Sequence, residues 1–322
     1  MCFKKITVED LLQTQIVFKK QISYKLEPLY MHYQELYHKT KFSNKSIKIN
    51  NDANIFIPLT KNIKTNLFSF YGGPIEFFSD TDISVSDYEK IKKFFDNLNG
   101  EKFFKFEIND EKKLIKHNFD YVEKVIKEVY INLSQDVTTI KSKFSSNFRN
   151  EIKKTYENVK FEIIDKNNYE KDLIFEMMEH HIKISKRQTR SKESWKKNEE
   201  MILNDKGFLV KVTYKNKLIS YSFFFHNNYT CIYFSSVGDR DYFKIARNMH
   251  HVSIWMAIKY AKKYCKFFYI GQNTLYDIKD FSEKEKNIEK FKSKFKGIDT
   301  KFVILNSLPD YSFYEKFILN KK

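Results

Sequence analysis

The pattern of apolar and polar positions is most regular in the second half of the chain. Apolar and polar residues alternate, as in a strand, over 208–214, and two further strands are predicted over 218–225 and 229–237. Short polar turns separate these segments, so together they predict an antiparallel meander. The apolar spacing then predicts a helix, a buried strand, a second helix and a last strand over 249–264, 265–271, 282–297 and 300–306. The predicted order of elements is β-β-β-α-β-α-β.

The first half of the chain repeats this outline less regularly. Strands are predicted over 54–60, 66–70, 102–109 and 124–133. Helices are predicted over 84–98, with Ser84 or Ser86 as N-cap, and over 111–119. Charged helical segments follow over 136–160 and 168–205, and no linker rich in Pro, Gly or Ser separates the halves. We therefore expect an α/β fold with mixed sheets, in which two halves pack around a cleft.

The predicted boundary between the halves follows residue 135. Residues 1–135 form the N-terminal half and residues 136–322 the C-terminal half, in which a helical region over 136–205 precedes the sheet of 208–305. The length of 322 residues agrees with two domains. The 42% of hydrophobic residues and 17% of aromatic residues are enough for a large core and exclude a disordered chain.

The charge permits anionic partners without identifying one. The chain has 58 Lys and Arg against 41 Asp and Glu, which gives a net charge of +17. Such a surface attracts nucleotides, tRNA and anionic membranes. Only five of the basic residues are arginine, however, although arginine is the residue that nucleic-acid recognition favours. A non-catalytic protein that binds polyanions through its charge and aromatic residues is therefore one alternative.

The cysteines and the N-terminus indicate the compartment. Cys2, Cys231 and Cys265 have no spacing typical of a zinc site, so we expect reduced thiols and no metal. Charged residues interrupt the N-terminal segment before it could serve as a signal peptide. No run reaches the ~18 apolar residues of a membrane span. We expect a cytoplasmic protein with peripheral contact to the anionic inner surface of a membrane.

A candidate anion site lies between the meander and the next helix. Free backbone N–H groups at the N-terminus of a helix favour anions. The segment 238–251 places basic and polar side chains at this point, and those expected to hold the donor cofactor are Arg240, Lys244, Arg247 and Asn248. The segment lacks the glycine-rich pattern that lets a backbone approach a pyrophosphate closely, so ordinary solvated charges are the alternative interpretation.

Four segments carry a family resemblance: FSFYGGPIEF at 68–77, VYINLSQDVTTIKSKFSSNFRNEIKKTYENVKFEI at 129–163, IYFSSVGDRDYFKIARNMHHVSIWMAIKYAKKYCKFFYIG at 232–271 and FKSKFKG at 291–297. In order and spacing they resemble the Fem family of peptidoglycan aminoacyltransferases and the related Fem/BioF2-like acyltransferases. The resemblance covers roughly residues 54–305. It implies two halves with the GNAT acyltransferase fold.

The resemblance also implies roles for individual residues. Lys292 matches a lysine near the reacting carbonyl, where an ammonium group stabilises the oxyanion. Arg149 matches a basic residue that holds a substrate phosphate. The positions expected to bind substrate are Tyr71, Gly72, Gly73, Gln272 and Asn273. The alternatives are a chance lysine at Lys292, an ion pair of Arg149 with Glu151 or Glu157, and a plain turn at 71–73.

The histidines offer one further catalytic candidate. His250 or His251 stands at the start of a helix near the expected cleft, and we take His250 as the group that accepts the proton of the amine. A structural role is the competing interpretation, because no carboxylate is identifiable as its partner.

These observations predict an N-acyltransferase of the GNAT type. It would transfer an acyl group from an activated carrier, acyl-coenzyme A, directly to an amine of a cell-envelope or surface-glycan precursor. The acceptor would be an aminosugar nucleotide, a lipid-linked sugar or a stem peptide, and no cofactor would stay bound. The alternative is a Fem-type aminoacyltransferase that uses aminoacyl-tRNA on a peptidoglycan precursor. The long helical arm of some peptidoglycan enzymes has no counterpart here, because 168–205 is too short.

Overall fold

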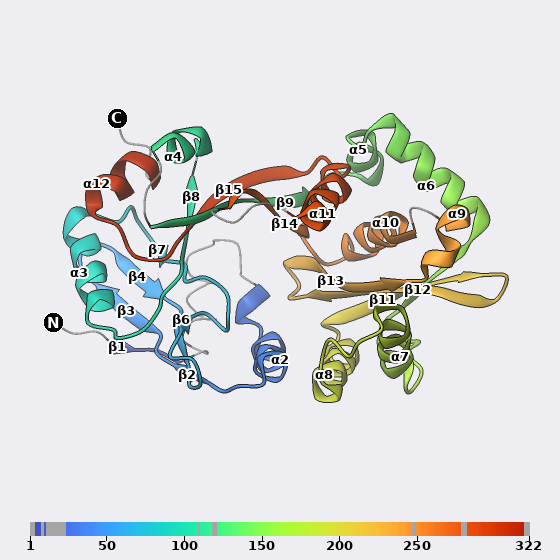
Figure 1. Cartoon of the computed structure of the whole chain (residues 1–322), viewed down its shortest axis with the longest axis horizontal. Helices are drawn as coiled ribbons and strands as arrows, with labels where there is room; N and C mark the ends of the chain where they lie inside the picture. The colour runs from blue at the N-terminus through green and yellow to red at the C-terminus, as the bar shows by residue number, and fades with distance from the viewer. Residues whose placement is uncertain are drawn as a thin grey trace.

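The computed structural model describes residues 4–7, 10, 24–108, 110–117, 121–246, 249–277 and 282–318. An eight-stranded sheet runs through the molecule (Figure 1). Across the sheet, its strands are β10 (Lys160–Ile164), β11 (Gly207–Tyr214), β12 (Lys217–His226), β13 (Thr230–Gly238), β14 (Phe267–Asp277), β9 (Val122–Asn132), β15 (Ile298–Leu305) and β8 (Phe104–Ile108). All neighbours pair antiparallel except β13 and β14, which are parallel.

The elements predicted for the second half are confirmed in type and order. After the meander of β11, β12 and β13 come α10 (Met249–Ala261), β14, α11 (Glu283–Ser293) and β15. The helix α11 begins with a capping box, in which the Ser282 hydroxyl accepts a hydrogen bond from the Glu285 N–H and the Glu285 carboxylate accepts one from the Ser282 N–H. The local sequence thus determines where this helix starts.

The first half contributes two small sheets as well as β8 and β9. One sheet contains β1 (Lys4–Lys5), β3 (Ile47–Asn50), β4 (Asn54–Ile57) and β7 (Phe78–Ser79), and the other contains β2 (Phe42–Asn44), β5 (Thr60–Asn62) and β6 (Phe68–Ser69). The single strand predicted over 54–60 is wrong, because β4 and β5 lie in different sheets. Pro58 stands between them, and proline has no N–H to donate to a ladder.

The helices surround these sheets. The first half has η1 (Tyr24–Leu26), α2 (Pro28–His38), α3 (Val85–Asp96) and α4 (Glu111–His117). The region 136–205 has α5 (Val137–Ser142), α6 (Ser146–Asn158), α7 (Leu173–Ser185) and α8 (Lys192–Leu203), with β10 between α6 and α7. Shorter helices are η2 (Arg240–Tyr242), α9 (Phe243–Ala246), α12 (Tyr311–Phe313) and η3 (Tyr314–Ile318). Neither α2 nor β10 was predicted.

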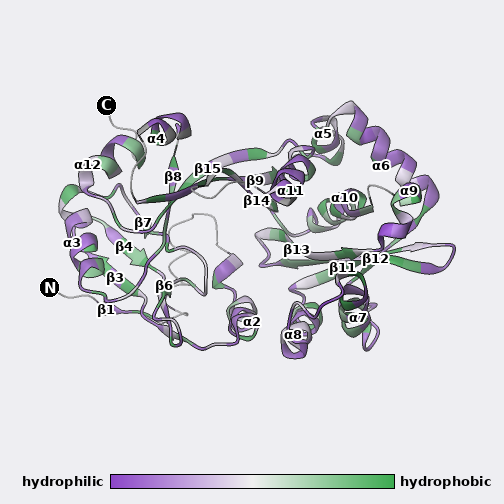
Figure 2. Cartoon of the chain, viewed as in Figure 1, coloured by the Kyte–Doolittle hydropathy of each residue, from purple (hydrophilic) through white to green (hydrophobic). Residues whose placement is uncertain are grey.

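Helices cover both faces of the meander (Figure 1). On one face, α5, α6 and α10 bury a cluster that includes Phe148, Trp255 and Phe224. On the other face, α2, α7 and α8 bury a cluster that includes Trp195 and Phe223. Figure 2 shows the outer helix α6 as largely hydrophilic, whereas α10, which packs between α6 and the sheet, has nine buried residues. The apolar residues therefore gather where helix and sheet meet.

The end of the described chain returns to the first half. Val303, Leu305 and Phe313 belong to the same hydrophobic cluster as Ile55, Phe104 and other residues of the first half. The strand β15 pairs with both β8 and β9, so the large sheet crosses the predicted boundary after residue 135. That boundary stays a prediction, and the structure adds that the two halves share one continuous sheet.

Candidate functional site

The parallel strands β13 and β14 separate after a short contact. They pair only from Thr230 to Ile232 and from Phe267 to Tyr269. Beyond this point β13 continues along β12 as far as Gly238, and β14 continues along β9, with an irregular register beside Gly271. One edge of β14 after Tyr269 is therefore unpaired in the described sheet, and its backbone groups are available to other partners.

Lys292 lies at this unpaired edge. Its Nζ reaches from α11 and donates a hydrogen bond to the carbonyl oxygen of Gln272 at 2.5 Å. Gly271 permits this approach, because its φ is +118° and a Cβ there would lie 2.8 Å from the Lys292 Nζ. Burial lowers the pKa of Lys292 to about 8, since removal from water disfavours the ammonium form. The structure thus brings together two of the predicted residues, Lys292 and Gln272.

Asn273 is the next residue along the unpaired edge. Its side chain is 3% exposed, and neither its Oδ1 nor its Nδ2 has a hydrogen-bond partner among the described residues. An unsatisfied buried amide costs about 1–3 kcal/mol, so such a group is retained where a ligand or water satisfies it. Asn273 pairs with Lys127 of β9, whereas Gln272 pairs with Glu128. Because side chains alternate along a strand, Gln272 and Asn273 point to opposite faces of the sheet.

His250 stands at the start of α10, beside the end of β13. A Cβ added to Gly238 would lie 2.7 Å from the His250 Nε2, so the imidazole packs against this glycine. Burial lowers the pKa of His250 to about 4, which makes it a weak proton acceptor at neutral pH. Its neighbour His251 stacks on Phe291 with ring centroids 4.1 Å apart and thereby joins α10 to α11. The catalytic role of His250 stays a prediction.

The segment expected to hold the donor forms two short helical turns, η2 and α9. Arg240 and Lys244 lie on these turns and are exposed. The Asp239 carboxylate caps η2 by accepting a hydrogen bond from the Asp241 N–H. Arg247 and Asn248 lie outside the described residues. The two described basic residues therefore face solvent between β13 and α10, where a large anionic donor can reach them.

Arg149 lies on α6 and binds the end of the preceding helix. Its Nη1 donates hydrogen bonds to the carbonyl oxygens of Ser142, at 3.0 Å, and of Phe144. A cation at the C-terminus of a helix satisfies free carbonyl groups and matches the helix dipole. Glu151, which was considered as its ion-pair partner, pairs instead with Lys294 at 2.9 Å. The described contacts of Arg149 are thus structural.

The turn at 71–73 lies in the first half, away from α11. Tyr71 has a positive φ of 47°, and Gly72 has a φ of +81° with space limited by the ring of His38. The Tyr71 N–H donates to the Thr60 hydroxyl, and Phe70 and Gly73 exchange two backbone hydrogen bonds. These bonds define a tight turn that leads directly into Glu76. The substrate-binding role of Tyr71, Gly72 and Gly73 stays a prediction.

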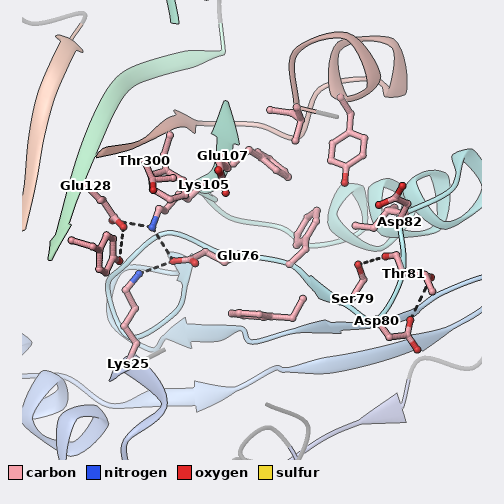
Figure 3. A pocket seen from close by; sticks show the side chains of 18 of the residues that line it. Lys25, Glu76, Ser79, Asp80, Thr81, Asp82, Lys105, Glu107, Glu128 and Thr300 are labelled. Atoms are coloured by element: carbon pink, nitrogen blue, oxygen red, sulfur yellow. Dashed lines mark hydrogen bonds and ion pairs between the residues drawn. The ribbon is translucent and has the colours of Figure 1, made fainter. Parts of the chain in front are cut away.

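Glu76 lines a pocket of about 650 Å³ that the sequence did not lead us to predict (Figure 3). Its walls come from both sides of residue 135, because Glu76, Lys105 and Glu128 meet Thr230 and Thr300 there. The aromatic residues of the walls are Tyr24, Phe77, Phe78, Phe106, Tyr130, Phe302 and Tyr314. The volume falls in the range of small-molecule sites, roughly 300–1,000 Å³.

Two lysines and two glutamates form a buried network at one end of this pocket (Figure 3). Lys105 pairs with Glu128 at 2.9 Å and with Glu76 at 3.6 Å, and Lys25 pairs with Glu76 at 2.8 Å. The side chains of Lys105 and Glu128 are only 6% and 7% exposed. The Tyr130 hydroxyl donates to the second carboxylate oxygen of Glu128 at 2.9 Å. Each buried charge in the network therefore has a partner of opposite sign, as burial requires.

The network changes the pKa values of its members in opposite directions. Burial alone would raise the pKa of Glu76, but the ammonium groups of Lys105 and Lys25 outweigh it and lower this pKa to about 2. Burial disfavours the charge of Lys25, but the carboxylates of Glu76 and Glu128 outweigh it and raise the pKa to about 12. Both groups are therefore charged at neutral pH.

The sequence contained a weak signal for this network. Lys105 stands between two phenylalanines in β8, and charged residues are rarely buried unless paired. Glu128 gave no such signal, because β9 also contains Glu123, Lys124 and Lys127. The signal could not identify the partners, because Lys25 and Glu76 lie far away in the sequence.

Two further properties concern membranes and metals. Over the described ranges, no helix combines the length and the apolar composition that crossing a bilayer requires. Within the same ranges, no three His, Cys, Asp or Glu side chains are grouped so that they could hold a metal ion.

The fold is similar to that of FemX, in agreement with the Fem resemblance of the sequence. The chain is similar to the crystal structure of FemX, with a TM-score of 0.60, 10% sequence identity and coverage of 98% of this chain and 99% of that chain. It is also similar to the C-terminal DUF2156 domain of a protein from Agrobacterium fabrum named as a lysylphosphatidylglycerol synthetase, with a TM-score of 0.52, 10% identity and coverage of 98% and 99%. No protein-family model and no curated protein matches the sequence. The likeness at this identity is one of fold.

Proposed function

We propose that this protein is an acyltransferase that moves an acyl or aminoacyl group from an activated carrier to an amine. The observation that carries the proposal is the position of Lys292, whose ammonium group lies at the unpaired edge of β14. A cation fixed beside free backbone groups stabilises the negative charge that develops on a carbonyl oxygen during acyl transfer. Asn273 adds a buried amide without a described partner on the same stretch of β14.

The reaction requires a neutral amine that attacks the carbonyl carbon of the donor. The carbonyl oxygen becomes an oxyanion, which the Lys292 ammonium stabilises. The carbonyl then re-forms as the bond to the carrier breaks, and the carrier leaves with the proton that the amine gives up. With a pKa of about 8, Lys292 is mostly protonated at neutral pH and can fill this role. Direct transfer fits the described cysteines, because Cys231 and Cys265 are buried and burial raises the pKa of Cys265 to about 12.

The finer parts of the proposal concern donor and acceptor. We propose a coenzyme A thioester as donor, held by the exposed basic residues Arg240 and Lys244. The acceptor would be an amine of a cell-envelope precursor. The second candidate donor is an aminoacyl-tRNA. It is supported by the fold neighbour from A. fabrum, which is named for a product that carries a lysyl group.

The test measures acyl transfer by mass spectrometry with acetyl-coenzyme A and with aminoacyl-tRNA, on aminosugar nucleotides and lipid-linked precursors. We expect Lys292→Met to lower kcat about 10²–10³-fold, the usual effect of removing one oxyanion donor. Lys290→Met is the matched control, since Lys290 is exposed on the same helix. Activity that is lost when the donor is treated with RNase would support aminoacyl-tRNA as the donor. Binding of any polyanion without turnover would contradict both enzymatic proposals.

The pH dependence tests the role of Lys292 separately. If the ammonium form is active, the rate falls as pH rises through about 8, the pKa that burial gives Lys292. Lys292→Arg keeps the charge at high pH, because the guanidinium does not lose its proton in this range. The variant should therefore lose the alkaline fall. A wild-type rate that instead rises through pH 8 would show that the neutral amine of Lys292 acts as a base.

A further inference from the structure

The pocket of Figure 3 has a charge opposite to that of the whole protein. Its walls carry the five carboxylates of Glu76, Asp80, Asp82, Glu107 and Glu128, but only two ammonium groups, those of Lys25 and Lys105. The chain as a whole has a net charge of +17. We infer that this pocket binds an organic cation, a ligand that carries a protonated amine or guanidinium group. The inference does not rest on the proposed acyl transfer.

The two lysines of the pocket are not available to an anionic ligand. Each is already paired with carboxylates, Lys25 with Glu76 and Lys105 with Glu76 and Glu128, at distances of 2.8–3.6 Å. An anion such as a diphosphate would have to displace a buried carboxylate, and removing one partner of a buried pair is strongly unfavourable. The two lysines and the two glutamates at this end of the pocket thus neutralise one another. The excess negative charge lies on other residues of the lining.

The excess negative charge lies among residues 80–82 and at Glu107. Asp80 is held by Asn54, whose backbone N–H and side-chain amide donate to it at 2.9 and 2.7 Å. Asp82 and Glu107 are exposed and form no salt bridge with any described residue. These two carboxylates line a pocket that also contains aromatic rings, and rings attract cations through their faces. An ammonium or guanidinium group is attracted both by the carboxylates and by the faces of the rings.

The size and the polar groups of the pocket favour an organic ligand. About 650 Å³ is far more than a single ion needs, and the described residues there do not form a metal-binding group. Thr230 contributes a buried hydroxyl to the lining that has no partner among the described residues. A ligand with one cationic group and a further hydrogen-bonding group therefore matches the pocket.

The site is separate from the unpaired edge at Lys292. The pocket lining contains Glu128 and Tyr130 of β9 but neither Lys292 nor Asn273. Lys292 approaches β14 from the α11 side, where it contacts the Gln272 carbonyl. Failure of acyl transfer would consequently leave the binding inference intact, and the reverse also holds.

The test is isothermal titration of the full chain with spermidine, cadaverine and arginine methyl ester at neutral pH and low ionic strength. Non-specific binding of these cations is weak, because a protein with a charge of +17 repels them. We expect saturable binding of at least one probe to a single site. UDP and inorganic pyrophosphate serve as anionic probes.

Variants decide whether the binding occurs in the pocket. Asp82→Asn with Glu107→Gln should weaken binding of the cation by about tenfold, since each exposed ion pair contributes up to about 1 kcal/mol. Glu89→Gln is the control, because Glu89 is an exposed carboxylate on α3 outside the pocket lining, and it should change the affinity less than twofold. Equal affinity in the double variant, or no saturable binding of any cation, overturns the inference. So does UDP binding that Lys25→Met abolishes.

Discussion

Two partly buried lysines in this protein, Lys25 and Lys292, have opposite electrostatic environments. The pKa of Lys25 is raised to about 12, because Glu76 and Glu128 outweigh the effect of burial. The pKa of Lys292 is lowered to about 8, because burial acts alone and the described hydrogen bond is to a neutral carbonyl group. Burial disfavours the charge in both cases, and the neighbouring carboxylates decide the direction of the shift.

The comparison distinguishes a structural role for Lys25 from the catalytic role proposed for Lys292. The charges around Lys25 are paired, so they hold the first half together around the pocket. The charge of Lys292 has no carboxylate partner among the described residues, so it remains available to a negative charge that forms during a reaction. A lysine whose pKa lies near physiological pH is also one whose charge can respond to a ligand.

The largest effect on stability is expected when the buried pair of Lys105 and Glu128 is broken. Lys105→Met leaves Glu128 buried without its closest cation, at present 2.9 Å away. Loss of one partner of a buried pair costs about 3–5 kcal/mol, and we expect this loss in the free energy of unfolding measured by urea denaturation. Adding Glu128→Gln should recover part of it. Lys92→Met, which breaks an exposed pair with Asp96, should cost no more than about 0.5 kcal/mol. Equal losses in the two single variants would mean that the buried pair contributes no more to the free energy of unfolding than the exposed pair does.

A smaller effect concerns the acid stability that Glu76 provides. Its pKa is about 2 in the folded protein and 4.5 ordinarily, so its contribution is complete above pH 4.5 and is lost as pH falls toward 2. The shift corresponds to about 3 kcal/mol. We expect the free energy of unfolding to fall across this range in the wild type and less steeply in Glu76→Gln. Parallel pH curves for the two proteins would contradict the pairing of Glu76 with Lys105 and Lys25.

The smallest effect is expected at the unpaired edge. Gly271→Ala places a methyl group 2.8 Å from the Lys292 Nζ at a φ of +118°, which alanine rarely adopts. We expect a loss of roughly 1–2 kcal/mol in thermal unfolding and a displaced Lys292. Gly73→Ala is the matched control, because its nearest neighbour lies at 3.4 Å and its φ is not positive. A Gly271→Ala protein as stable as this control, with an unchanged alkaline fall in rate, would show that the close approach is unimportant.

Much of the second half could be predicted from the sequence, because its signals are local. The strand patterns over 208–237, the helical spacing over 249–264 and the capping Ser282 each act within one element or one turn. Ser84 or Ser86 was likewise predicted as the N-cap of α3, and it is Ser84 that forms a capping box with Asp87. The order of these elements, together with the four family-like segments, led to the Fem-type fold that the comparison with FemX confirms.

The first half was predicted less well, because its strands are short and depend on partners far away in the sequence. The segment 54–60 has the composition of one strand, yet Pro58 divides it between two sheets. The helix α2 was missed, although Pro28 at its first position is a typical start. It packs through Tyr33 against Phe234 of β13, a contact that no local pattern contains.

The sequence by itself determined the elements of the second half after residue 208, their order, and the position of Lys292 four residues after Ile288 on a helix. Only the tertiary structure decided that Lys25, Glu76, Lys105 and Glu128 meet, and that the ammonium of Lys292 lies against the unpaired edge of β14. Periodicity and capping depend on neighbours within a few residues of the chain. Charge pairing and desolvation depend on distance through space, which the fold alone establishes.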